Sequence, residues 1–278
     1  MNNISKLFTI ISITTSLFIG FTGAAIAETK DVKKTDNIES KFSDLSDCKK
    51  AIVNLEESKI LKLCEEDSKT DGYVQFIFGK LYFEGKTVEV NYTEAKEWFE
   101  KAKENGSADA ISALGTMYYF GAGVDLSTVK AAENYKEAAE KNSSDGQMRY
   151  ATMLLLGQGG LEKDTDKARE YYIRSARKGN GMSLFHLGYI YFEGIGVDTD
   201  YEKSYIYFSA ASFVNASDKI STLMGKLNER LEGINKAELN DKAQKYINKY
   251  IKPNMLGSDE HKEKMIENLS SIKNDDKS

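Results

Sequence analysis

The side chains best suited to catalysis or metal binding are few in this sequence. It holds two histidines, His186 and His261, and two cysteines, Cys48 and Cys64. The histidines fall on different predicted elements with no clustered partner, so neither a zinc site nor a catalytic triad is predicted. Cys48 could act as a nucleophile, but a disulfide with Cys64 explains it better. The sequence therefore predicts no catalytic residue, no metal site and no cofactor.

Two other local patterns resemble known ligand-binding loops. The Gly-x-Gly sequences Gly121–Gly123 and Gly194–Gly196 could suggest a phosphate-binding loop. However, both follow predicted helices rather than strands, and no Lys-Ser or Lys-Thr comes after them, so they are interpreted as turns. The acidic pairs Asp164–Asp166 and Asp198–Asp200 lack the ligand spacing of a calcium loop, and they are interpreted as solvated helix starts.

The N-terminus has the three-part layout of a secretory signal peptide. Lys6 precedes an uncharged apolar run, Leu7–Phe21, which is followed by the Ala-x-Ala sequence Ala25–Ala27. Cleavage is predicted after Ala27, with an uncleaved N-terminal anchor as the alternative. We therefore expect an exported protein, either periplasmic or secreted.

Export would place the two cysteines in an oxidising compartment, where disulfides persist. Cys48 and Cys64 lie symmetrically about Glu56. A helical hairpin over residues 45–68 would bring them face to face, and a bridge would stabilise the fold by about 3 kcal/mol. Two buried free thiols are the alternative interpretation.

The chain's formal charge of −5 becomes −6 when Lys6 is removed with the signal peptide. Nucleic acid requires a basic surface, so it is not expected as a partner. The sequence also offers no polybasic patch for anionic lipid, and no membrane insertion is expected after signal cleavage. A single proline fits long runs of helix.

A four-fold internal repeat organises the rest of the chain. One eight-residue pattern occurs at Phe78–Gly85, Leu114–Gly121, Tyr150–Gly157 and Leu187–Gly194. It predicts a first helix that ends at a glycine turn. The second helix of each repeat carries an aromatic residue, at Phe99, Tyr135, Tyr172 and Phe208.

A small residue lies on the apolar stripe of each first helix, at Gly79, Gly115, Ala151 and Gly188. We expect it to let the partner helix approach closely, so that a larger residue would overpack the contact. Because no repeat can bury its apolar stripe alone, neighbouring repeats must stack on one elongated core.

The pattern A-x-x-x-L-G-x-x-Y-x-x-G-x-G-V, followed by K-A and Y-x-x-A-A, resembles the Sel-one-like (Sel1-like) repeat, a relative of the tetratricopeptide repeat. The second repeat matches best, whereas the first lacks the second turn glycine and the third has Ala151 and Leu154 in place of Gly and Tyr. The resemblance implies an all-α fold, a right-handed α/α superhelical solenoid of helix–turn–helix repeats with capping helices. It implies no shared catalytic residue.

The expected organisation combines the leader, the repeats and their caps. It comprises a signal peptide (1–27), a disordered leader (28–44), an N-terminal capping helix pair (45–70), four repeats (71–215), C-terminal capping helices (216–252), and a weak helix with a disordered tail (253–278).

The resemblance also implies that the first helices line the concave face. Positions off the buried stripe are then the candidates for partner binding, and they form three rows. The first row is Ile77, Ala113, Arg149 and His186; the second is Lys80, Thr116, Thr152 and Tyr189; the third is Phe83, Tyr119, Leu155 and Phe192. Aromatic residues and arginine suit a protein or peptide partner. The third row could instead be inter-helix core.

The candidate partner-binding residues are Lys80, Phe83, Thr116, Tyr119, Arg149, Thr152, His186, Tyr189 and Phe192. We expect a non-enzymatic protein–protein interaction module, an exported scaffold, adaptor or inhibitor of an envelope or secreted protein. The alternatives are a cell-wall-active hydrolase acting on peptidoglycan or a β-lactam, and a secreted host-interaction factor. The sequence indicates neither the partner nor the oligomeric state.

Overall fold

The computed structural model describes residues 40, 41, 43, 45–254 and 259–271. The chain divides into two compact units, Met1–Asp44 and Leu45–Ser278, and the description below concerns the second. The predicted signal peptide and almost all of the predicted leader lie outside the described residues. Every regular element in the described part is helical, which confirms the all-α prediction.

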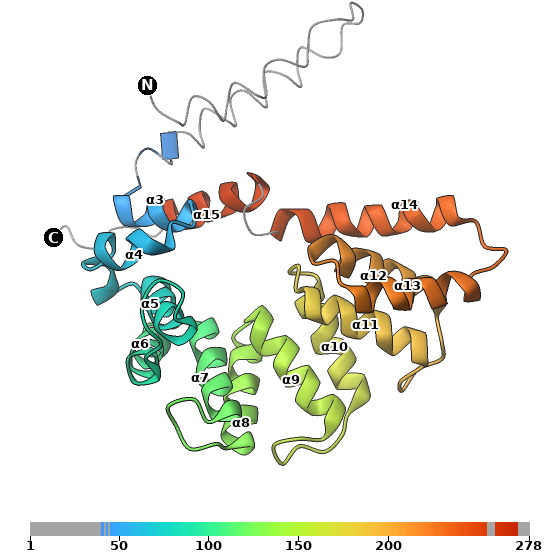
Figure 1. Cartoon of the computed structure of the whole chain (residues 1–278), viewed down its shortest axis with the longest axis horizontal. Coiled ribbons are helices and arrows are strands. Elements are labelled where there is room, and N and C mark those ends of the chain that lie inside the picture. Colours follow the sequence, from blue (N-terminus) through green and yellow to red (C-terminus); the bar gives the residue numbers. More distant parts are fainter. Residues whose placement is uncertain (1–39, 42, 44, 255–258, 272–278) are drawn as a thin grey trace, which may run out of the picture. The chain divides into compact units, whose positions relative to one another are not determined.

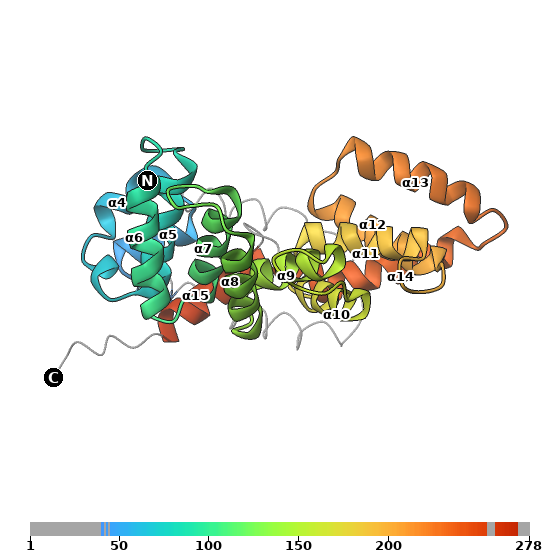
Figure 2. The same cartoon turned by 90° about the horizontal axis from the view of Figure 1, so that it is seen from below.

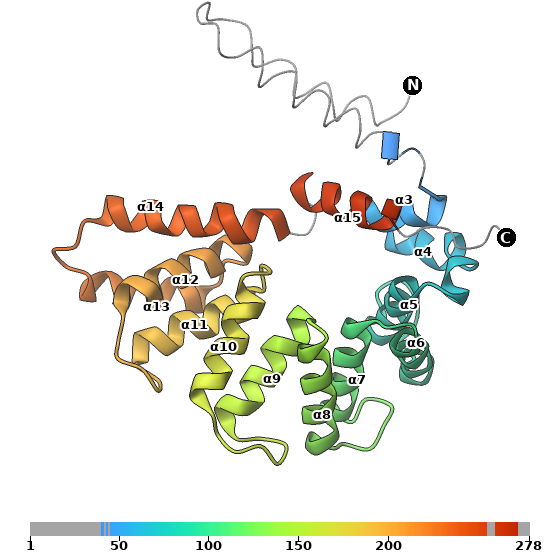
Figure 3. The ribbon, with the colours of Figure 1, turned by 180° about the vertical axis from the view of Figure 1, so that it is seen from behind.

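Four helix pairs form the body of this unit and follow one another along a curved path (Figures 1 and 3). The pairs are α5 (Gly72–Glu84) with α6 (Tyr92–Glu104), α7 (Ala108–Phe120) with α8 (Thr128–Glu140), α9 (Ser144–Leu156) with α10 (Thr165–Ala176), and α11 (Gly181–Glu193) with α12 (Tyr201–Val214). The second helix of each pair packs on the first helix of the next, as α6 does on α7 and α8 on α9. The predicted solenoid is therefore present.

Local sequence fixes where the first helices begin and end. Each begins after a side chain that accepts a backbone N–H bond, and these caps are Asp71, Ser107, Ser143 and Asn180. Each ends at a glycine in the left-handed conformation, with φ between 65° and 70° at Gly85, Gly121, Gly157 and Gly194. A residue with a side chain would be strained there, so these glycines set the length of the first helix.

At Gly79, Gly115 and Gly188 the backbone of the first helix lies against the aromatic ring of the partner helix, so the close approach predicted at these positions is present. A Cβ added at Gly79 would come within 2.5 Å of the Phe99 ring, and one added at Gly115 within 2.8 Å of the Tyr135 ring. The third repeat accommodates a methyl group instead, at the fully buried Ala151. Close helix approach in these repeats therefore depends on the missing side chain.

The N-terminal cap consists of α3 (Asp47–Val53), α4 (Glu57–Leu63) and the short 3₁₀ helix η1 (Asp67–Lys69). The Cys48–Cys64 disulfide is present, with Cα atoms 4.7 Å apart and both residues buried. Not every apolar side chain of this cap is buried, because Leu55 and Leu63 are 47% and 40% exposed. Leu55 lies in the tight turn between the helices, with φ at 56°, which directs its side chain away from the core.

The C-terminal cap begins with α13 (Asp218–Arg230) and α14 (Lys236–Tyr246), which both pack on α12 (Figure 2). The α-helical geometry of α14 ends at Tyr246, where the chain changes into a π-helical turn, η2 (Ile247–Ile251), and then into the 3₁₀ turn η3 (Lys252–Asn254). The Lys252 N–H bonds the Ile247 carbonyl, five residues back, just before Pro253, which has no N–H.

The last helix, α15 (Asp259–Ser271), packs on the N-terminal cap. It contacts α3, and Met265 lies on the cluster around the disulfide. The two ends of the unit therefore meet (Figures 1 and 3).

Candidate functional site on the inner side of the repeats

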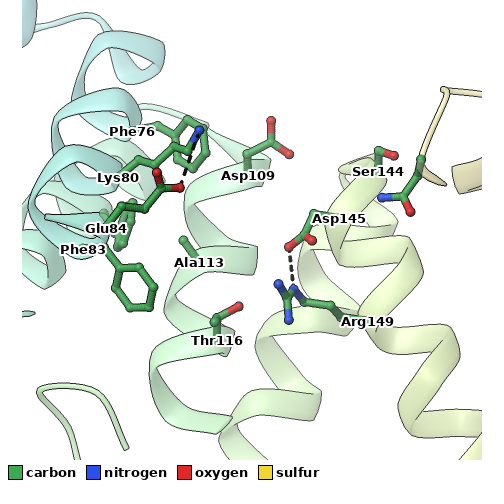
Figure 4. A pocket seen from close by; sticks show the side chains of 12 residues that line it. Phe76, Lys80, Phe83, Glu84, Asp109, Ala113, Thr116, Ser144, Asp145 and Arg149 are labelled. Carbon is green, nitrogen blue, oxygen red and sulfur yellow. Dashed lines mark hydrogen bonds and ion pairs between the residues drawn. The ribbon is translucent and has the colours of Figure 1, made fainter. Parts of the chain in front are cut away.

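A groove of about 440 Å³ lies where the first helices of three successive repeats meet. These helices contact each other directly, α5 with α7 and α7 with α9, so the path of the repeats is tightest on this side. Residues from all three helices line the groove (Figure 4). The groove therefore belongs to the inner surface that the resemblance indicated.

One wall of the groove is aromatic and comes from α5. Phe76 and Phe83 are half-buried, and their ring centroids lie 6.0 and 6.3 Å from that of the buried Phe99. Lys80 projects between them and pairs with Glu84, one helical turn further on, at 3.6 Å. The wall thus offers apolar surface with an ion pair at its rim.

The opposite wall carries a hydrogen-bonded arginine on α9. The Arg149 Nε donates to Asp145 Oδ2 at 2.7 Å, and the Ser112 hydroxyl donates to the same oxygen at 2.6 Å. The guanidinium carbon lies 5.7 Å from the centroid of the Tyr135 ring. Burial alone would lower the pKa of Arg149, but the charge of Asp145 and the partners around it raise it overall. Arg149 is therefore a fixed cation whose carboxylate partner is already in place.

Asp109, on the first turn of α7, stands at one end of the groove. Its Oδ1 accepts a hydrogen bond from the Ser143 hydroxyl at 2.6 Å, and Ser143 also caps α9. Tyr73 of α5 is partly exposed, and the partial burial of its phenol, followed by the negative charge of Asp109, raises its pKa. Among the described residues, no cation pairs with Asp109.

The predicted threonines use their hydroxyl groups within the fold. Thr116 Oγ1 donates to the Ser112 carbonyl at 3.1 Å and lies 3.3 Å from the Tyr135 hydroxyl. Thr152 makes the equivalent contact with Tyr172 at 2.8 Å. Thr116 still lines the groove, whereas Thr152 does not.

The remaining predicted residues lie outside this groove. His186 stacks on Tyr172 with ring centroids 4.9 Å apart, and burial, then nearby Lys219, lowers its pKa. Tyr189 is 37% exposed and stacks parallel to Phe185. The groove therefore brings together four of the nine predicted residues, namely Lys80, Phe83, Thr116 and Arg149.

The third predicted row is partly core and partly surface. Phe83, Tyr119, Leu155 and Phe192 are all half-buried and pack against the apolar clusters. The Tyr119 hydroxyl lies 3.5 Å from Gln158, and Phe192 packs against Tyr201.

Sequence reasoning missed the acidic side of the groove. Asp109 and Asp145 occupy equivalent positions near the start of α7 and α9, and Phe76 lies one turn before Lys80. These positions also differ between repeats, and that variation was the signal that could have found them. Asp109 lies one helical turn before Ala113 of the first predicted row, and Phe76 lies one turn before Lys80 of the second, so the predicted rows did not include them.

Among the described residues, no group of histidine, cysteine and carboxylate side chains could hold a metal ion. No helix in the described ranges is both long and apolar enough to cross a membrane.

Comparisons with known proteins agree with this architecture. Residues 74–107, 108–143, 144–180 and 181–212 each match the family model of the Sel1 repeat. Among solved structures, the chain is similar to a protective antigen of uropathogenic Escherichia coli that displays an SLR fold, with 25% identity and a TM-score of 0.60. That match covers 79% of this chain but 45% of the antigen, so this chain spans less than half of the antigen's length.

A second solved structure, a Sel1 repeat protein from Oxalobacter formigenes, shares 28% identity and has a TM-score of 0.54. The match covers 68% of this chain and 79% of that one. No curated protein matches the chain.

Proposed function

This chain belongs to the Sel1 repeat family, whose members generally mediate protein–protein interactions, and we propose that it is a non-enzymatic binding module. It acts as a scaffold, adaptor or inhibitor of an envelope or secreted protein. Its inner surface, defined here as the groove residues together with Tyr189, receives that partner.

The observation that carries this proposal is the groove itself. It combines an aromatic wall with fixed charges, and its 440 Å³ lie in the size range of sites that hold a small ligand or a short segment. Aromatic and arginine side chains are the residue types that most often dominate binding energy at protein interfaces. Cys48, the residue that could have served as a nucleophile, is held in a buried disulfide.

An exported location is part of the proposal. The buried Cys48–Cys64 disulfide is compatible with an oxidising compartment, in which such bonds persist. The domain boundaries predicted from the sequence, with a mature chain beginning at Glu28, remain part of the same proposal.

A secreted host-interaction factor is the second candidate. The similarity to a protective antigen of a uropathogen is the observation that favours it. Fractionation of the producing cells separates the two: retention in the envelope supports the first, and release into the medium supports the second. Turnover of peptidoglycan or a β-lactam by the purified chain would instead support the hydrolase alternative.

Affinity capture from an envelope extract of its own organism tests the binding function. The inner-surface variant combines Phe83→Ala, which removes part of the aromatic wall, with Tyr189→Ala. The control combines Leu126→Ala with Val129→Ala, two exposed apolar side chains at the start of α8 and in the turn before it. The native chain and the control should retain a partner that the inner-surface variant loses. Equal retention by all three would refute the assigned surface.

A further inference from the structure

We propose that the groove between α5, α7 and α9 binds an extended segment of a partner protein in which a lysine or arginine adjoins an apolar side chain. In this complex Asp109 receives the cation, and the wall formed by Phe76 and Phe83 receives the apolar group. This inference rests on the proposed binding function and specifies the chemistry of the partner.

The charge balance of the groove is the first argument. Three carboxylates, Glu84, Asp109 and Asp145, face two cations, Lys80 and Arg149. Each cation is already paired with a carboxylate on its own helix, at 3.6 Å for Lys80 and 2.7 Å for Arg149. Glu84 also pairs with Lys86, at 2.7 Å, and among the described residues Asp109 is the lining carboxylate that makes no ion pair. At this position a basic group would meet attraction and an acidic group would meet repulsion.

The position of Asp109 is the second argument. Its Oδ1 is anchored by the Ser143 hydroxyl at 2.6 Å, which holds the carboxylate in place. Lys178 lies close enough for the charge of Asp109 to act on it, but its ammonium donates its hydrogen bonds to the backbone and side-chain oxygens of Asn142 and makes no ion pair with Asp109. Figure 4 shows Asp109 at the end of the groove between Phe76 of α5 and Ser144 of α9. Because the Asp109 carboxylate is already oriented, it would lose little conformational entropy when a cation binds to it.

The apolar wall is the third argument. Phe76 and Phe83 rest on the buried Phe99, so their rings are held in place before a ligand arrives. Ala113 faces this wall from α7, at a position where the other repeats carry Ile77, Arg149 and His186. The small side chain leaves room in this repeat for an inserted aliphatic group. The wall and Asp109 line the same groove, so one short segment can reach both.

Peptide binding measured by fluorescence anisotropy tests the proposal. The probes are three short labelled peptides with blocked ends and one Gly/Ser background, carrying Leu-Lys, Leu-Glu or Ser-Lys at the centre. The Leu-Lys peptide should bind about tenfold more tightly than either of the others. Its affinity should fall as salt rises from about 0.05 to 0.3 M, because the partly exposed ion pair is screened. Equal affinities, preference for Leu-Glu, or no binding of any probe would overturn the proposal.

Variants of one residue locate the cation. Asp109→Asn retains a side-chain oxygen for Ser143 and should weaken Leu-Lys binding about three- to tenfold. Asp109→Lys should reverse the preference toward Leu-Glu. The matched control is Asp198→Asn, an exposed aspartate in the turn before α12, which should change nothing. Unchanged binding by folded Asp109→Asn refutes the role of this carboxylate.

Ala113→Leu tests the apolar part independently of charge, and it should abolish Leu-Lys binding by filling the space beside Phe76 and Phe83. The same variant distinguishes the proposed binding function from the proposed basic chemistry of the partner. If Ala113→Leu loses a partner captured from the envelope extract while the Leu-Lys peptide does not bind the native chain, the binding function stands and the basic partner is refuted. If the native chain captures nothing and binds no peptide, both are refuted.

Discussion

Adding one methyl group at Gly79 should destabilise the first repeat, although alanine is the better helix former. In the Gly79→Ala variant the new Cβ would lie 2.5 and 2.6 Å from two carbons of the Phe99 ring, where ordinary contacts begin near 3.4 Å. The ring cannot easily withdraw, because Phe99 is 2% exposed and packs against Phe76 and Phe83.

The magnitude follows from two opposing contributions. Overpacking of a tight core costs about 1–3 kcal/mol, with the upper part of that range expected for a contact about 1 Å too short. Replacing glycine by alanine inside a helix returns about 1 kcal/mol. The net loss should be about 1–2 kcal/mol, which lowers the melting temperature of a chain of this size by about 2–8 °C.

Thermal and urea unfolding followed by far-UV circular dichroism measure this loss. The matched control is Gly225→Ala in α13, where a Cβ meets nothing within 4 Å. The control should gain about 0.5–1 kcal/mol from helix propensity alone. If Gly79→Ala is stabilised as much as Gly225→Ala, the close approach of α5 and α6 has been misjudged.

The remaining predictions concern the cap, a helix end and pH. Replacing Cys48 and Cys64 by serine should lower the free energy of unfolding by about 3 kcal/mol, and reductant should then leave the melting temperature unchanged, which a melt with and without reductant checks. Ser143→Ala removes the N-cap of α9 and the anchor of Asp109, so urea unfolding should show a loss of about 1 kcal/mol. Burial and then Lys219 lower the pKa of His186 in the folded state. Below about pH 6.5 the unfolded chain therefore binds a proton that the folded chain does not, and stability falls as the pH drops toward the folded pKa. His186→Phe keeps the stacking on Tyr172 and should flatten this fall between about pH 7 and 5. Part of the fall should persist in that variant, because burial, then Lys264, also lowers the pKa of His261; an unchanged pH profile would contradict the role of His186.

Much of the fold could be predicted from the sequence because the repeat is a local device. The turn glycine Gly121 and the close pair Gly115–Tyr135 each need only neighbours within about one repeat, and these recur in register. The same locality predicted the Cys48–Cys64 bridge, which closes a single helical hairpin. A departure such as the π-helical turn after Tyr246 was not predicted, because the apolar spacing of Ile247 and Ile251 is equally that of an α-helix.

The candidate site depended on which side chains from different repeats share one space. Periodicity placed Arg149 in the first predicted row and Lys80 and Thr116 in the second. It did not indicate that the Thr116 hydroxyl would contact Tyr135 or that Arg149 would pair with Asp145. It also missed Asp109, which enters the groove beside residues of α5 and α9. Those relations depend on the small rotation between successive repeats, which accumulates over many residues and is not encoded in any one of them. The sequence by itself thus determined the helices, their turns and their stacking, because these depend on short-range contacts. Only the tertiary structure decided which charged side chains share the groove on the inner surface, because they come from different helices and repeats.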